Sequence, residues 1–451
     1  MRWSELEGRR VVIFGTGREG IALAEHLLGS GVRALYAADD RDGDSAAAWR
    51  GRFGAAVPLL IAPSAATLRL KRLQVAIASP GIPPHGALRR AAQQAKLRVT
   101  TATDLWLTEN AARTTAVTGS KGKSTTAALV HAISVAHGVS CELGGNIGIP
   151  LLRLPGAERY AAELSSYQCS SVTTSPDVAV LTALFPEHLD WHGSEEQYYA
   201  DKLNLIAHGP RRVIVNGEDP RLLAALERFS PDVDVELVGA AENRWSVSGR
   251  AGSREILRDG VRFVDASTLP LVGRHNLRNA ALALAAVEAA GTELDATTAL
   301  TALAGFRPLE HRLERVSDPS GLVFIDDSLS TSPFAAVAAL EALDTRDLVL
   351  IVGGQDRGVD YAPLAEYLQQ HPVAAVIGLP DSGPRILQAL APTGILTVPV
   401  DGMDAAIRTA RKVIDDGIVL LSPAAPSYGH YRDYADRAAD FRRAILASAL
   451  A

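Results

Sequence analysis

A glycine-rich loop between a β-prone run and a helix-prone run constrains this chain more than any other segment. Residues 115–126 read TAVTGSKGKSTT, and an alanine-rich stretch follows. Glycines at a strand-to-helix turn let backbone N–H groups approach phosphate oxygens, and the helix N-terminus adds partial positive charge. The segment therefore predicts a parallel α/β fold and a nucleoside triphosphate, which we expect to be ATP.

The residues of this loop have separate expected roles. Lys123 would reach the terminal phosphates, and the hydroxyl of Ser124 or Thr125 would ligate Mg²⁺. The loop is shorter than the G-x-x-x-x-G-K-[ST] form, because only Ser120 and Lys121 separate Gly119 from Gly122. A surface turn rich in Gly and Lys is the alternative, but the flanking strand and helix favour phosphate binding.

Composition sets the class of protein. The 451 residues are 47% hydrophobic and 21% charged, which suits two to four soluble domains. The net charge of −6 comes without a basic block, so nucleic acid is not expected as the main partner. No apolar run reaches the ~18 residues of a membrane helix, and the charged N-terminus is unlike a signal peptide. With only Cys141 and Cys169, we expect a cytoplasmic protein.

Strand-like runs alternate with alanine- and leucine-rich helical runs, which indicates parallel sheets covered by helices. We expect three domains, at residues 1–112, 113–307 and 308–451. A small β insertion is expected within 240–270. The expected strands include residues 10–14, 34–38, 75–78, 98–100, 177–181, 213–215, 322–325, 348–352, 376–378 and 418–421.

The first block carries a second glycine turn after a strand. Gly15, Thr16, Gly17 and Arg18 form it, and Asp39 follows about twenty residues later. This spacing fits a dinucleotide fingerprint, and a UDP-type diphosphate would suit it as well as NAD. Glycines at such turns also occur for packing alone. Another turn begins at Ser79, and this residue is a candidate for the same crevice.

Other candidates lie near expected strand ends or on the helices that follow. Glu163 ends a short strand and is a magnesium candidate, although a solvated glutamate is almost as good a reading. His188 lies in the segment EHLDWH, and Lys202, read alone, is a solvated lysine on a helix. Asn276 is expected to cap the helix that contains Asn279.

The motifs together resemble the Mur ligases, the ATP-dependent amide-forming family of peptidoglycan precursor synthesis. The resemblance covers nearly the whole chain, and the first block is most similar to the glutamate-adding members, which act on UDP-N-acetylmuramoyl-L-alanine. It rests on VTGSKGKST, GGNIGIP, ELSSYQ, EHLDWHGS with Lys202, GRHNLRN, HRLE, DDS and LSPAAPS.

The resemblance implies an N-terminal Rossmann-like UDP-binding domain, a central P-loop ATPase domain with a parallel sheet, and a C-terminal Rossmann-like domain. It implies catalytic roles for Lys123, His188 and Lys202, and two Mg²⁺ sites built from Ser124, Glu163, His188 and a carbamylated Lys202. The remaining implied contacts are Asn279, Arg312 and Asp327 with ATP, and Gly15, Thr16, Gly17, Arg18, Asp39, Ser79 and Asn146 with the UDP substrate.

The third block departs from the pattern of ligases that add D-glutamate. Leu329 and Arg357 stand where those enzymes have lysines. A guanidinium fork is not equivalent to an ammonium point charge, so the amino-acid pocket, expected to contain Thr331, Arg357, Ser427 and Tyr434, is rebuilt. We favour L-glutamate as substrate, with a later epimerase and a monomeric enzyme, and D-glutamate is the alternative.

Three other functions are weighed against this one. An NAD-dependent oxidoreductase would explain the first glycine turn but leaves the phosphate loop and Lys202 unexplained. A ligase similar to folylpolyglutamate synthase would lack the first block. A non-catalytic ATP-binding protein would not need Lys123, Glu163, His188 and Lys202 all intact.

Overall fold

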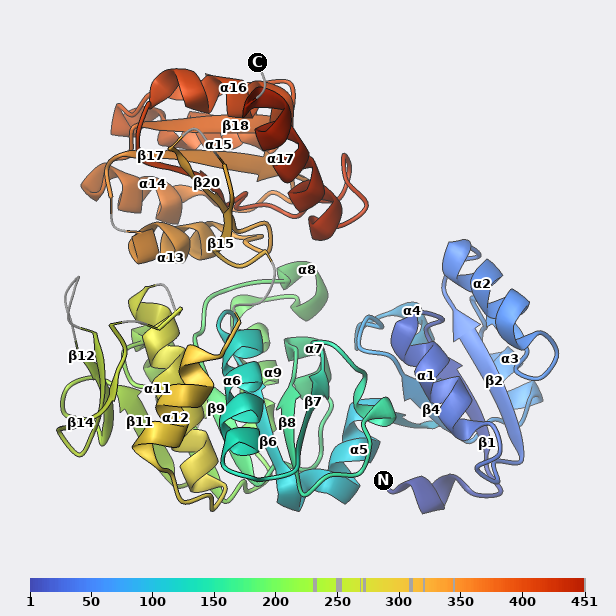
Figure 1. Ribbon diagram of the computed structural model, residues 1–451. Helices are drawn as coiled ribbons and strands as arrows, with labels where there is room; N and C mark the ends of the chain where they lie inside the picture. The colour runs from blue at the N-terminus through green and yellow to red at the C-terminus, as the bar shows by residue number, and fades with distance from the viewer. Residues whose placement is uncertain are drawn as a thin grey trace. The chain divides into compact units, whose positions relative to one another are not determined.

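The computed structural model describes residues 1–229, 233–248, 254–267, 269–270, 273–307, 311–318, 321–343 and 345–449. The strands form three sheets, one within each range expected to be a domain (Figure 1). The predicted α/β class is confirmed, and the domain boundaries stay predictions. Two compact units are present, residues 1–268 with 278–305 and residues 269–277 with 306–451. None of the described helices is both long and apolar enough to cross a bilayer.

The first sheet is entirely parallel, in the order β3-β2-β1-β4-β5. Its central strand is buried on both faces, as expected where helices cover both sides. Helices α1 and α2 pack on one face, and α3 and α4 on the other. The elements are β1 (Arg10–Phe14), β2 (Ala34–Asp39), β3 (Leu59–Ile61), β4 (Val75–Ala78), β5 (Arg98–Thr101), α1 (Arg18–Leu27), α2 (Asp44–Phe53), α3 (Ala65–Leu70) and α4 (Ala87–Gln94).

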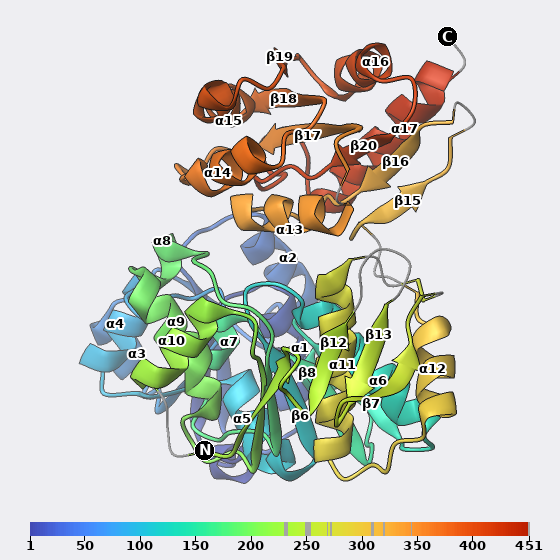
Figure 2. The same cartoon turned by 90° about the vertical axis from the view of Figure 1, so that its left-hand side faces the viewer.

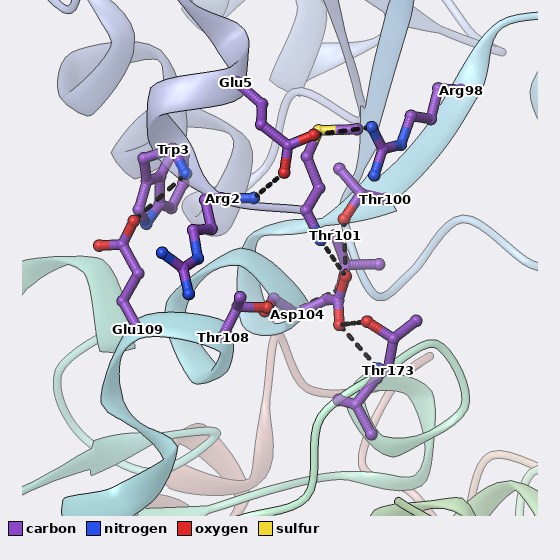
Figure 3. Close-up of polar contacts among 12 residues, drawn as sticks. Arg2, Trp3, Glu5, Arg98, Thr100, Thr101, Asp104, Thr108, Glu109 and Thr173 are labelled. Atoms are coloured by element: carbon purple, nitrogen blue, oxygen red, sulfur yellow. Dashed lines mark hydrogen bonds and ion pairs between the residues drawn. The ribbon is translucent and has the colours of Figure 1, made fainter.

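Helix α5 (Ala102–Asn110) joins the first sheet to the second and belongs to both cores. Leu105 packs in the core of the first sheet, whereas Trp106 and Leu107 pack in the core of the second. Figure 3 shows Asp104, whose carboxylate accepts hydrogen bonds from the amide of Thr173 at 2.7 Å and its hydroxyl at 2.8 Å. The helix therefore fastens the first two sheets together.

The central sheet has nine strands in the order β14-β13-β12-β11-β10-β9-β6-β8-β7. Its strands are parallel as far as β12, and β13 and β14 add an antiparallel edge. The insertion expected within 240–270 thus extends this sheet. The strands are β6 (Thr114–Thr118), β7 (Cys141–Gly145), β8 (Arg159–Glu163), β9 (Val178–Leu181), β10 (Arg212–Asn216), β11 (Val235–Gly239), β12 (Trp245–Ser248), β13 (Glu255–Arg258) and β14 (Val261–Asp265).

The helices of this region include the one after the phosphate loop. The predicted cap at Asn276 is wrong, because α11 already begins at Arg274 and places Asn276 in its first turn. The helices are α6 (Lys123–Ala136), α7 (Ser166–Cys169), α8 (Leu189–His192), α9 (Glu195–Leu203), α10 (Pro220–Phe229), α11 (Arg274–Ala289) and α12 (Ala296–Ala304).

The third sheet has the order β15-β16-β20-β17-β18-β19 and is parallel except for β15. Helices α13, α14 and α15 cover one face, and α16 and α17 cover the other (Figure 2). The elements are β15 (Glu314–Val316), β16 (Val323–Asp326), β17 (Leu348–Gly354), β18 (Ala375–Asp381), β19 (Thr397–Pro399), β20 (Ile418–Leu421), α13 (Pro333–Leu343), α14 (Ala362–Gln370), α15 (Gly383–Leu390), α16 (Met403–Val413) and α17 (Tyr434–Ala449).

Candidate active site

The phosphate loop lies between β6 and α6, as predicted, and its two glycines have no room for a side chain. Gly119 and Gly122 have φ of 143° and 88°, a region that favours glycine. A Cβ on Gly119 would lie 2.1 Å from Thr182 Oγ1, and one on Gly122 would lie 2.6 Å from Asn279 Oδ1. The structure thus places Asn279 beside the loop.

The loop is held in shape by side chains from distant parts of the chain. Ser120 Oγ donates to the Phe185 carbonyl at 2.7 Å and lies 2.8 Å from the Tyr198 hydroxyl. Thr182 Oγ1 donates to the Lys121 carbonyl at 2.5 Å. The sequence analysis missed these contacts of Thr182 and Tyr198, because they join segments about sixty to eighty residues apart.

Two lysines bring positive charge to this loop. Lys123 Nζ donates to the Ser120 carbonyl at 2.9 Å, and Lys202 Nζ to the Gly119 carbonyl at 2.7 Å. Lys202 is only 2% exposed, which rules out its reading as a solvated lysine. Burial lowers the pKa of Lys202 to about 7, and the charge of Lys123 acts in the same direction.

Glu163 ends β8 and is also buried, at 1% exposure, so it is not a solvated strand-end glutamate. Its Oε1 accepts a hydrogen bond from Asn146 Nδ2 at 2.8 Å. Its Oε2 is buried and has no hydrogen-bond partner in the described part of the chain. An oxygen in this state is costly unless a partner such as a hard cation satisfies it. The residues present therefore fit a Mg²⁺ ion.

The segment EHLDWH contains two histidines in different surroundings. His188 is exposed, has a left-handed backbone with φ of 55°, and its ring lies 5.1 Å from that of Tyr167. His192 is buried, with Nδ1 2.6 Å from Asp201 and Nε2 3.0 Å from the Ser166 hydroxyl. His192 therefore holds α7 and α9 together, and His188 is the histidine open to a ligand.

The glycine turn of the first block lies between β1 and α1. Asp39 Oδ2 accepts hydrogen bonds from the Thr16 amide at 3.0 Å and its hydroxyl at 2.6 Å. Gly15 has φ of 95°, and a Cβ there would lie 3.1 Å from the side chain of Ser79. The hydroxyl of Ser79 is buried without a hydrogen-bond partner among the described residues. Four of the predicted UDP-side residues therefore meet at this turn, and Gly17 caps α1 next to Arg18.

Asn146, the remaining residue predicted on the UDP side, lies elsewhere in the first unit. Its backbone amide donates to the Glu163 carbonyl at 2.9 Å, in addition to the side-chain bond to Glu163. Asn146 is exposed. It therefore borders the magnesium candidate.

Two of the predicted ATP contacts belong to the second unit. Asp327 is 5% exposed and accepts a hydrogen bond from the Ser422 hydroxyl at 2.8 Å and another from Ser330. Arg312 is partly buried just before β15. Their contact with a nucleotide stays a prediction.

The four predicted amino-acid residues are also in the second unit. Ser427 is 5% exposed and lines a cleft of about 500 Å³, which Thr331, Arg357 and Tyr434 do not line. Arg357 is exposed, with Nε 3.1 Å from Gln355 Oε1. Tyr434 begins α17, with its ring 5.8 Å from that of His311.

Known proteins match this chain along its length. The Mur ligase middle domain matches residues 117–287, and the Mur ligase glutamate ligase domain matches residues 311–425. The UDP-N-acetylmuramoyl-L-alanine–L-glutamate ligase of Salinispora tropica is 45% identical over 449 residues, which cover 99% of each chain. The ligase of the same description from Xanthomonas axonopodis pv. citri is 37% identical over 465 residues, with 98% of this chain and 96% of that one covered.

Solved structures share the fold. The UDP-N-acetylmuramate-alanine ligase MurC from Thermotoga maritima aligns with a TM-score of 0.60 and 20% identity, covering 97% of this chain and 99% of that one. MurF from the same organism, solved with ADP, aligns with a TM-score of 0.62 and 16% identity, covering 99% and 97%.

The phosphate loop and the two domain matches define an ATP-dependent ligase. With a full-length relative at 45% identity, the chain belongs to the Mur ligase family, as the sequence predicted. The alternative of an NAD-dependent oxidoreductase is thereby set aside.

Proposed function

We propose that this protein joins L-glutamate to UDP-N-acetylmuramoyl-L-alanine, with conversion of ATP to ADP, in peptidoglycan precursor synthesis. The observation that carries the proposal is the end-to-end similarity to the L-glutamate ligase of Salinispora tropica, 45% identical over 449 residues. Leu329 and Arg357, in place of two lysines of the ligases that add D-glutamate, support the choice of isomer. The proposal includes a monomer in the cytoplasm and a separate epimerase that inverts the added residue.

The reaction proceeds in two steps. The carboxylate of the UDP substrate attacks the γ-phosphorus of ATP, and the bond to ADP breaks, which gives an acyl phosphate. The amine of glutamate then attacks the acyl carbon, phosphate leaves, and the nitrogen loses a proton. Lys123 and the amides of the loop Gly119–Gly122 neutralise the phosphate charge, while the buried contacts of Ser120 keep the loop in place.

The nucleotide and substrate contacts complete the proposal. Asn279, Arg312 and Asp327 contact ATP together with Lys121, Ser124 and Thr125. The turn Gly15–Arg18 with Asp39 and Ser79 receives the UDP group, and Asn146 contacts the same substrate beside Glu163. Thr331, Arg357, Ser427 and Tyr434 receive glutamate.

Ser124, Glu163, His188 and a carbamylated Lys202 would hold Mg²⁺ at two sites. Bound there, Mg²⁺ supplies positive charge to the phosphate oxygens. Glu163 contributes the buried oxygen that has no hydrogen-bond donor among the described residues. Lys202 is enclosed beside the Gly119 carbonyl, and a buried neutral amine can add CO₂ and release a proton. The resulting carbamate provides oxygen ligands in place of an ammonium.

ADP release by the purified protein tests the proposal. The assay contains ATP, Mg²⁺ and UDP-N-acetylmuramoyl-L-alanine, and it compares L-glutamate with D-glutamate. We expect turnover with L-glutamate and little with D-glutamate. Turnover with D-glutamate alone would establish the alternative isomer, and no turnover with either would refute the proposed substrate.

A further inference from the structure

The turn between β10 and α10, residues 216–219, contributes none of the residues predicted to bind a substrate, yet it contacts the segment that holds the phosphate loop. Strands β6, β9 and β10 are neighbours and run parallel. The phosphate loop, the segment after β9 and this turn therefore all follow the carboxyl ends of adjacent strands. Polar side chains at this edge of a sheet are placed to act on a bound ligand or on the loops that bind it.

The segment after β9, residues 182–185, supports the phosphate loop directly. The Ser120 amide donates to the Ala183 carbonyl at 2.6 Å, and the Ser120 hydroxyl accepts from the Phe185 amide at 3.0 Å. These bonds add to those that the Thr182 hydroxyl and the Phe185 carbonyl make with the loop. The position of the segment therefore sets the position of the loop amides that face the phosphates.

The turn holds this segment at two points. Asn216 is 1% exposed, and its Nδ2 donates to the Thr182 carbonyl at 2.7 Å. Asp219 Oδ2 accepts a hydrogen bond from the Leu184 amide at 2.7 Å. Because these two bonds lie on either side of Ala183, they restrain the residue whose carbonyl supports the loop.

Both side chains are also anchored at their other oxygen. Asp219 Oδ1 accepts from the amides of Arg221 at 3.0 Å and Leu222 at 3.1 Å, in the first turn of α10. Asn216 Oδ1 accepts from the Glu218 amide at 3.0 Å. Each side chain thus spans from its own turn to the segment after β9, with hydrogen bonds at both ends that limit its movement.

Glu218 connects the same turn to α11. Its Oε2 accepts from Arg278 Nη1 at 2.8 Å, in an ion pair whose side chains are about one-fifth exposed. Arg278 directly precedes Asn279, the predicted nucleotide contact that lies beside Gly122. The turn is therefore linked to the nucleotide side of the site as well as to the phosphate loop.

We infer that Asn216 and Asp219 are positioning residues for the reaction of ATP, which hold the phosphate loop in place through residues 182–185. The inference rests on the proposed function. Both residues act through the backbone of another segment, so their loss displaces the loop amides and Lys123 from the transferred phosphate. A misplacement of this kind lowers kcat and raises the KM for ATP, while the sites for the other two substrates keep their residues.

Steady-state kinetics of Asp219→Ala test the inference, with Asp295→Ala as the control. Asp295 accepts from the Thr298 amide at 2.7 Å at the start of α12, so both variants lose an acceptor at a helix start, but only Asp219→Ala loses the bond to Leu184. We expect kcat/KM for ATP to fall by about tenfold or more in Asp219→Ala. The KM values for the UDP substrate and L-glutamate should change less than about twofold. The control should keep the kinetic constants of the wild type, although Tm falls in both variants.

A conservative variant and a binding measurement keep the outcomes separable. Asp219→Asn keeps one acceptor oxygen, so it should recover part of the lost kcat/KM, and it serves if Asp219→Ala does not fold. ATP constants equal to those of the control, or an equal rise in all three KM values, would overturn the positioning role and leave the proposed function standing.

Calorimetric titration of the full chain with ADP and Mg²⁺ covers an inactive wild type. Binding weakened by Asp219→Ala but not by Asp295→Ala would then support the positioning role. Equal binding in the three proteins, or equal weakening in both variants, would overturn it.

Discussion

Two glycine turns of the first unit each join a strand to the helix that follows it, but side chains of opposite charge anchor them. The turn at Gly15 is fastened by the carboxylate of Asp39, which accepts two hydrogen bonds from Thr16. The loop at Gly119 is fastened by lysine side chains, since Lys123 donates to the Ser120 carbonyl and Lys202 donates to the Gly119 carbonyl. The glycines alone therefore do not decide the ligand.

The charge of the anchor decides which ligand chemistry suits each turn. A carboxylate attracts hydroxyl donors such as those of a ribose and repels phosphate oxygens. The ammonium group of Lys123, beside a helix N-terminus, attracts phosphate. We expect the second turn to bind the phosphates of ATP and Asp39 of the first turn to suit a hydroxyl of the UDP substrate, and three substitutions test this division.

Lys123→Ala is expected to have the largest effect. Without the ammonium at the loop, the charge that develops on the transferred phosphate lacks a partner, and kcat should fall by about 10²–10³-fold or more. ADP release at saturating substrates measures the loss, and circular dichroism checks the fold. Activity near the wild-type value would sink the assignment of this loop to ATP.

Lys202→Ala is expected to lower turnover by about a hundredfold or more, because it removes both the loop anchor and the proposed carbamate. Acetate or propionate at high concentration should restore part of the activity by standing in for the carbamate. Lys96→Ala, at an exposed site in the same unit, is the control. Its turnover should equal that of the wild type and should not change when acetate or propionate is added. Absence of rescue would leave Lys202 as an anchor of the loop alone.

Asp39→Ala tests the acidic anchor. Loss of two hydrogen bonds to Thr16 should loosen the first turn and raise the KM for UDP-N-acetylmuramoyl-L-alanine by about tenfold, with the KM for ATP nearly unchanged. The neighbouring Asp40 is exposed, so Asp40→Ala is a matched control. An equal rise in both KM values for Asp39→Ala would contradict the division between the two turns.

Glu19→Gln should have the smallest effect, and this effect should appear in the free energy of unfolding. Burial raises the pKa of Glu19 to about 7, while its carboxylate accepts a hydrogen bond from Gln168 at 3.1 Å. A raised pKa means that the folded state binds the proton more tightly, so the wild type loses stability as pH rises from about 4.5 to 7.

Glu19→Gln has no titrating carboxyl group at this position, so it should not lose stability as pH rises. Its free energy of unfolding should exceed that of the wild type at pH 8 but not at pH 4.5, with a change of at most about 1.4 kcal/mol for each pH unit. Urea unfolding at the two pH values measures the difference. Glu227→Gln, at an exposed site, should show no such trend. A constant difference at both pH values would contradict the burial of this charge.

Much of the fold was predictable because local patterns carry it. The buried strands of the parallel sheets are continuous apolar runs, and β1, β4 and β20 begin and end at the predicted residues. Short edge strands such as β15 and β19 have only three residues each and escaped prediction. These strands form because each pairs with a neighbouring strand of the sheet.

The candidate site was predictable only where its residues are neighbours in the sequence. The phosphate loop follows from its own sequence, because glycine, lysine and hydroxyl act locally. The burial of Lys202 and Glu163 does not follow from their neighbours in sequence. It depends on packing between distant segments, such as the contact of Lys202 with Gly119 across 83 residues.

Helix α5 limits where the segments of two Mur ligases can be joined in a chimera. A chimera that exchanges the first 112 residues would give the central sheet a foreign Trp106 and Leu107, although both side chains pack in its core. It would also separate Asp104 from the Thr173 with which it is paired. A crossover before Ala102 would keep these side chains with their partners but would give the first core a foreign Leu105, so either crossover disturbs one of the two cores.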